Sequence, residues 1–129
     1  MNVLVNKKEK TKTFRELFVW KKSMNLVTEV YRATKTFPDT EKFSLTSQIR
    51  RSAVSVPSNI SEGYGRGSLK EYIRFLHISI SSLFELQTQL EISFNLGFIE
   101  KNEFTVLFDS SKEIERMLSS LIRSLKLSR

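Results

Sequence analysis

Residues 48–94 hold two long runs of helical periodicity on either side of a glycine-rich turn, Gly63-Tyr-Gly-Arg-Gly67. The first run contains one proline, Pro57, and the second, residues 69–94, contains neither proline nor glycine. Glycine accepts the left-handed backbone that ends many helices, whereas proline inside a helix removes one hydrogen bond and clashes with the preceding turn. The pattern predicts two long helices joined by a tight turn. Pro57 should kink the first of them, and a break into two helices is the alternative.

A further helix is expected on each side of this pair. Thr13-Phe-Arg-Glu16 fits a capping box, in which Thr13 accepts a hydrogen bond from the Glu16 amide, and it opens a helix to about residue 37. Ser68-Leu-Lys-Glu71 fits the same pattern and opens the helix to about residue 95. The last helix should run from residues 100–102 to about residue 127. Its inward positions keep strict spacing of three and four: Leu107, Ser111, Ile114, Leu118, Leu121 and Leu125.

Few residues are available for turns. The 129 residues include four glycines and two prolines, which is low for a β-sandwich with its many turns. Short connections between long helices make neighbouring helices antiparallel. We therefore expect an all-α fold, an antiparallel up-down-up-down four-helix bundle over residues 13–129, preceded by a flexible basic N-terminal tail over residues 1–12.

The positive charge gathers at the two ends of the chain. The net charge is +7, and residues 1–13 and 112–129 together contribute +6 of it. Basic ends on a nearly balanced body could bind polyanions, and solubility is the alternative explanation.

The composition excludes several kinds of site. There is no cysteine for a disulfide or thiolate metal site, and His77 is the one histidine, so no histidine cluster can form within a chain. His77 is expected to pack at the border of an apolar face, and no nucleophile pattern surrounds it. No apolar stretch reaches the roughly 18 residues of a membrane span, and the N-terminus lacks the apolar core of a signal peptide. We expect a cytoplasmic protein without enzymatic activity, metal, cofactor or membrane contact.

Two of the expected helices are apolar over more of their circumference than a single core requires. On the helix over residues 69–95, apolar residues cover about 180°, whereas about 100° suffices for one core. Ile78 and Ile92 add to its otherwise polar side, and the first helix has two apolar stripes side by side. The surplus predicts self-association, with deep packing inside a monomer as the alternative.

A polar column follows one face of the second helix. It comprises Gln48, Arg51, Ser55, Asn59 and Glu62, spaced by three and four. Such a mixed row suits a hydrogen-bonded seam against another helix or subunit, where Arg51 could pair with Glu62 or with Glu85 on the third helix. An ordinary solvated face is the alternative.

A basic group surrounds the glycine-rich turn. Its members are the nucleic-acid-binding candidates Arg50, Arg66, Lys70 and Arg74. Guanidinium and ammonium groups in a row bind phosphate oxygens by charge and hydrogen bonds. Glu71 lies among them, so an ordinary solvated surface is again the alternative.

Three short elements resemble the family of four-helix-bundle proteins encoded in intervening sequences of ribosomal RNA genes, which includes retroelement accessory proteins. They are Gln48/Arg50/Arg51, Asn59/Ile60/Glu62/Gly63 and Ser82/Glu85/Leu86. The resemblance spans about residues 14–125 and implies a homopentameric ring in which these residues specify the scaffold and not catalysis. It also implies RNA or DNA as a ligand and a protein partner such as a reverse transcriptase. A purely structural or protein-interaction module without a nucleic-acid role is the alternative function.

Overall fold

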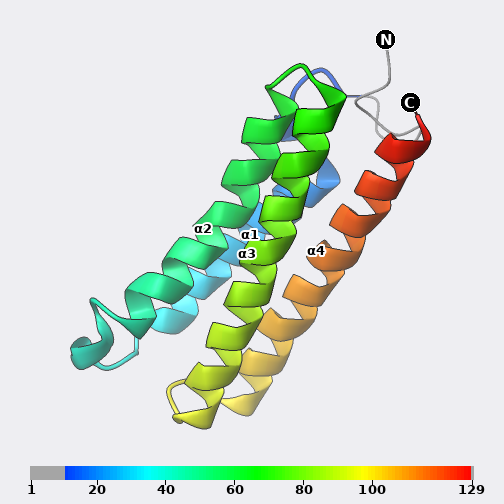
Figure 1. The fold of residues 1–129 in the computed structure, drawn as a ribbon. Helices are drawn as coiled ribbons and strands as arrows, with labels where there is room; N and C mark the ends of the chain where they lie inside the picture. The colour runs from blue at the N-terminus through cyan, green and yellow to red at the C-terminus, as the bar shows by residue number, and fades with distance from the viewer. Residues whose placement is uncertain (1–10, 129) are drawn as a thin grey trace.

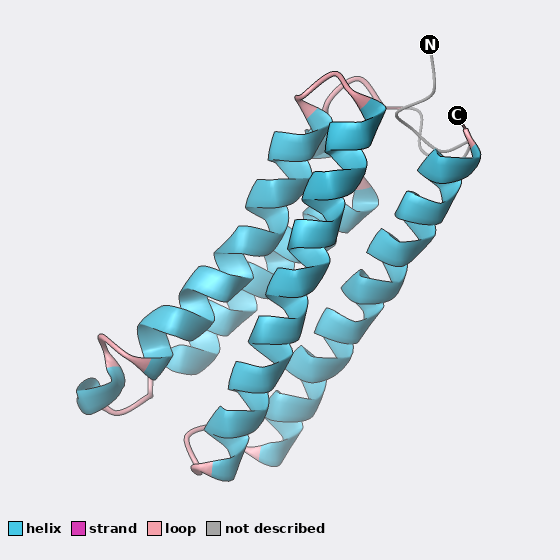
Figure 2. Cartoon of the chain, viewed as in Figure 1, coloured by secondary structure: helices cyan, strands magenta, loops and turns pink. Residues whose placement is uncertain are grey.

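The computed structural model describes residues 11–128, and within them it is helical apart from short connections, with no strand (Figure 2). Four long helices account for most of this range: α1 (Phe18–Thr34), α2 (Leu45–Tyr64), α3 (Leu69–Asn95) and α4 (Lys101–Leu127). Two short 3-10 helices, η1 (Phe14–Glu16) and η2 (Asp39–Glu41), precede α1 and α2. The all-α fold with four long helices expected from the sequence is confirmed. Residues 1–10 of the expected tail lie outside the described residues.

Successive long helices run in opposite directions, and the chain reverses at each of its connections (Figure 1). The start of α1, the α2–α3 turn and the end of α4 share one end of the bundle, and the η2 segment extends from the opposite end. No helix within residues 11–128 combines the length and the apolar character needed to cross a membrane.

The first helix begins and ends differently from the expectation. The Thr13 hydroxyl accepts from the Arg15 amide at 3.2 Å, while the Glu16 carboxylate accepts from the Lys12 amide at 2.8 Å. These bonds close the turn of η1, and the extended backbone of Leu17 then separates η1 from α1. The predicted capping box is therefore wrong. The helix also ends at Thr34 and not at about residue 37, and the Lys35 amide bonds to the carbonyl of Arg32, three residues back.

The second helix passes through Pro57 without interruption, so the alternative of two separate helices is excluded, and the kink stays a prediction. The turn that follows uses its glycines unevenly. Gly67 takes the left-handed backbone with φ of 72°, whereas Gly63 lies inside the helix and is buried. A Cβ atom on Gly63 would lie 2.6 Å from the Cβ of Phe75 on α3. The prediction that Gly63 ends the helix is wrong, because it serves the close approach of α2 to α3.

The third and fourth helices match the expected bounds closely. The Ser68 hydroxyl accepts from the Glu71 amide at 3.3 Å and caps α3. At the other end, Gly97 has a left-handed φ of 78°, and its amide and that of Phe98 bond back to the carbonyls of Phe94 and Ser93. All six inward positions expected for α4 are buried.

The core takes up the two stripes on α1 to different extents. Val19, Leu26, Val30 and Ala33 are buried in one stripe. In the other, Trp20 and Val27 are partly buried against the core, and Met24 and Tyr31 are exposed. Most of the wide apolar arc of α3 is buried within the single chain, which leaves Phe84 at 50% and Ile92 at 43% exposure. The exposed apolar surface on α3 is thus smaller than its sequence suggests. Further exposed apolar surface lies on α1.

Candidate nucleic-acid interface

Small polar side chains hold α2 against α3. The Ser52 hydroxyl bonds to Gln89 at 2.7 Å, and the hydroxyls of Ser55 and Ser82 lie 2.8 Å apart. The Ser79 hydroxyl donates to the carbonyl of Val56 at 2.9 Å, beside Pro57. These short side chains and Gly63 let the two helices approach closely while the hydroxyls of Ser52, Ser55, Ser79 and Ser82 stay hydrogen-bonded.

The polar column is divided by this packing. Ser55 and Asn59 join the contact with α3, and the Asn59 amide donates to the Ser55 hydroxyl at 2.9 Å. The other members, Gln48, Arg51 and Glu62, are exposed, as is Glu85. Glu62 pairs with Arg66 at 3.0 Å and not with Arg51, since eleven residues separate Arg51 from Glu62, about 16 Å along a helix.

Three of the four basic candidates meet at the α2–α3 turn. We call Arg66, Lys70 and Arg74 the turn cluster. The guanidinium groups of Arg66 and Arg74 lie 4.9 Å and 4.6 Å from the centre of the Phe75 ring. Both are already paired within the chain, Arg66 with Glu62 at 3.0 Å and Arg74 with Glu71 at 3.1 Å.

The pairing within the turn cluster also affects titration. The hydrogen bonds that Arg74 donates lower the pKa of the Glu71 carboxyl, and they raise the pKa of the Arg74 guanidinium. Both groups therefore keep their charges at neutral pH, and those charges largely cancel. Within residues 11–128, Lys70 is the member of the turn cluster without a carboxylate partner.

The fourth candidate, Arg50, lies elsewhere. It is sixteen residues before Arg66, about 24 Å along α2. Its Nε donates to the Thr34 hydroxyl at 2.9 Å, and its guanidinium lies 4.4 Å from the centre of the Tyr31 ring. Sequence spacing placed Arg50 with the turn cluster, and this grouping is wrong because the side chain faces α1.

Arg50 instead belongs to a groove between α1 and α2 with a volume of about 510 Å³. We call it the basic groove; it is lined by Tyr31, Lys42, Phe43, Thr46, Ser47, Arg50, Arg51 and Val54. The lining contains three cations and no carboxylate. Nearby Glu41 accepts from the Ser44 hydroxyl at 3.0 Å and from the Leu45 amide at 3.4 Å, so its charge serves the start of α2.

Two aromatic rings accompany the cations of the basic groove. Phe43 is 88% exposed, and the Lys42 ammonium lies 5.4 Å from its ring centre. On the other side of the groove, the ring of Tyr31 packs against the Arg50 guanidinium. Sequence analysis missed Lys42, Phe43 and Tyr31 as site residues, because they sit on different elements and share no periodicity. A phenylalanine beside a lysine, outside the apolar spacing of α2 and just ahead of that helix, was the available signal.

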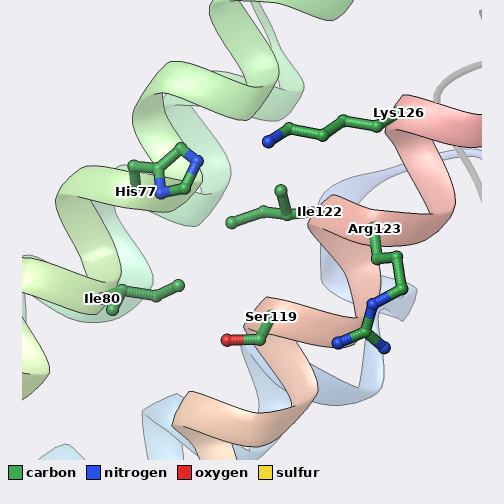
Figure 3. Close-up of a pocket in the computed structure, with 6 residues that line it drawn as sticks. All are labelled: His77, Ile80, Ser119, Ile122, Arg123 and Lys126. Carbon is green, nitrogen blue, oxygen red and sulfur yellow. The ribbon is translucent and has the colours of Figure 1, made fainter.

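A second, smaller pocket of about 280 Å³ lies between α3 and α4 (Figure 3). Ile80 and Ile122 form its apolar part, the amine of Lys126 extends toward His77, and Arg123 turns away. His77 is exposed, so its expected packing role is wrong. No group of three or more His, Asp or Glu residues that could hold a metal ion occurs in the described part of the chain.

Comparison with known proteins places this bundle among relatives. A family model described as 23S rRNA-intervening sequence protein matches residues 15–120. A crystal structure of a protein of unknown function from the S23 ribosomal protein family of Bacteroides thetaiotaomicron superposes with a TM-score of 0.76 and 26% sequence identity. The match covers 81% of this chain and 95% of that one. No curated protein matches the sequence significantly.

Proposed function

This chain belongs to the family of 23S rRNA-intervening sequence proteins, and from that premise we propose that it is a non-enzymatic, homo-oligomeric nucleic-acid-binding protein. The observation that carries the proposal is the basic groove, where Lys42, Arg50 and Arg51 line one hollow without a carboxylate. RNA or DNA would bind there through its phosphates. Cytoplasmic location and service to a nucleic-acid enzyme such as a reverse transcriptase belong to the same proposal.

Phosphate binding requires cations that are free to meet phosphate oxygens, because each contact releases condensed counterions from the nucleic acid. Arg51 has no ion pair among the described residues, and the partners of Lys42 and Arg50 are neutral. In the turn cluster, by contrast, a phosphate must displace Glu62 or Glu71. We therefore place the main contact at the basic groove, with Lys70 and its paired neighbours as a secondary contact.

Self-association would multiply this charge. Exposed apolar side chains outside the basic groove, Met24 on α1 and Phe84 and Ile92 on α3, support an intermolecular surface. A pentamer, which the family resemblance implies, would bring together five grooves. A groove whose affinity for nucleic acid is low on its own would then act together with the others, because one strand could bind several grooves at once.

We expect sedimentation at micromolar concentration to give an oligomer, with a pentamer at about five times the 15.0 kDa chain mass. Phe84→Glu combined with Ile92→Glu should shift the protein toward the monomer, since two charges would enter an apolar contact on α3. Val106→Glu on α4 is the control, because Val106 is also exposed but lies on another helix. A wild-type particle of a single chain mass would refute the oligomer.

Replacing Lys42 and Arg51 with glutamine should weaken binding of a labelled RNA or DNA by about tenfold at 50 mM salt. The slope of log affinity against log salt should fall by about 2, since each lost phosphate contact removes about 0.9. Fluorescence anisotropy between about 50 and 200 mM salt measures both quantities.

Arg66→Gln with Arg74→Gln is the matched control, because it removes the same two positive charges from a surface already paired with glutamates. An equal loss in both double variants would assign binding to overall charge and not to the groove. Binding that ignores salt would favour the alternative of a structural or protein-interaction module, because apolar docking responds weakly to screening.

A further inference from the structure

We propose that the basic groove is a subsite for an unpaired nucleotide, and that it selects single strands over duplexes. The inference rests on the proposed nucleic-acid binding and adds what the groove recognises. The base would stack on Phe43 or Tyr31, its phosphates would lie on Lys42 and Arg51, and its edge would reach Thr46.

The arrangement of rings and cations supports a base and not a phosphate alone. Phe43 is 88% exposed at the start of the α2 segment, and Tyr31 is 41% exposed on α1 across the groove. Every base has a face that can stack on an aromatic ring, but in a duplex both faces are covered by neighbouring base pairs. Lys42 lies beside one ring and Arg50 beside the other, so a stacked base would bring its phosphates within reach of positive charge.

Thr46 supplies an independent indication of a ligand. It lines the groove, is 8% exposed, and its hydroxyl has no hydrogen-bond partner among the residues that the structure describes. Buried polar groups in folded proteins nearly always have partners. The Thr46 hydroxyl is itself closed to solvent, so a base would reach it only after side chains that line the groove with it move. The edge of an unpaired base carries free donors and acceptors, which pairing consumes in a duplex.

The size and charge of the groove narrow the choice of occupant. Its volume of about 510 Å³ falls within the range of about 300–1,000 Å³ typical of small-ligand sites. Three cations without a carboxylate require an anionic occupant. An acidic peptide would satisfy the cations but would leave the two ring faces and the hydroxyl unused. A second copy of this chain, with its own net charge of +7, has the wrong overall sign.

The experiment compares labelled oligouridylate with an RNA duplex of equal length, using the full chain at low salt and fluorescence anisotropy. We expect tighter binding of the single strand. Phe43→Ala should reduce single-strand affinity about tenfold and leave duplex affinity within about twofold, since stacking and not charge is lost. Phe43→Trp should keep the preference. Thr46→Val should weaken single-strand binding about threefold, and Thr46→Ser should restore it.

Leu127→Ala is the control for Phe43→Ala, because Leu127 is also strongly exposed but lies at the end of α4. An oligodeoxyuridylate arm, which lacks only the ribose 2′-hydroxyl, separates RNA from DNA: equal binding places Thr46 on the base, and a loss that Thr46→Val does not deepen places it on the ribose hydroxyl.

Three results would overturn the inference: no preference for the single strand, an equal effect of Phe43→Ala on both probes, or a change in sedimentation instead of binding. If the wild type binds neither probe, the proposed function fails as well. Salt-sensitive binding that does not depend on Phe43 would overturn the nucleotide subsite and leave the proposed nucleic-acid binding standing.

Discussion

Replacing Gly63 with alanine is expected to lower the free energy of unfolding by about 2 kcal/mol, although alanine is the better helix former. The added Cβ would lie 2.6 Å from the Cβ of Phe75 and 3.2 Å from the carbonyl oxygen of Tyr72. Neither atom can rotate away, because one is fixed to the backbone and the other belongs to it. The two helices must separate, and the hydrogen bonds between their serines must lengthen.

Gly65→Ala is the matched control, two residues further along. A Cβ on Gly65 would meet its nearest neighbour at 3.6 Å, an ordinary contact, and its backbone is right-handed with φ of −79°. This change should leave stability unchanged or raise it by about 0.5 kcal/mol. Urea unfolding followed by circular dichroism measures both at one fixed protein concentration, because association would add stability. Equal stability of the two variants would contradict the close approach of α2 to α3.

Leu118→Ala should lower the free energy of unfolding by about 3 kcal/mol. Leu118 is fully buried in the core between helices, where removal of its methyl groups loses their transfer free energy and leaves a cavity. The same unfolding measurement tests it, and the midpoint should fall without a change in its steepness.

Leu127→Ala removes the same atoms from a side chain that is 82% exposed. It should change the free energy of unfolding by less than about 0.5 kcal/mol. A comparable loss at both positions would mean that Leu127 is buried in solution, most directly by another copy of the chain.

The helices themselves follow from local patterns. Spacing of three and four along α4 identified six of its seven buried positions and missed Ile122, because a helix places residues so spaced on one face whatever it packs against. The cap at Ser68 was likewise visible, since its hydroxyl satisfies the start of α3 through a neighbouring residue. The predicted capping box at Thr13 was wrong, because the 3-10 turn of η1 hydrogen-bonds the Thr13 hydroxyl as well as an α-helix would.

The candidate site followed from sequence only in part. Arg50 was predicted to contact phosphate, which stays a prediction, and it was grouped with the wrong neighbours. Its true surroundings, Tyr31 on α1 and Lys42 ahead of α2, are reached across a connection whose course no periodicity predicts. Thr46 was missed because an unsatisfied hydroxyl is a property of its surroundings and not of its type.

The sequence alone determined where the long helices lie, that they form an all-α fold, and which side of α4 turns inward. The tertiary structure alone decided how far each stripe of α1 enters the core, why Gly63 must lack a side chain, and which cations share a groove. The physical reason is that helical spacing sets the relative angles of residues on one helix. It does not set how far neighbouring helices rotate and slide against each other, and packing between them decides that.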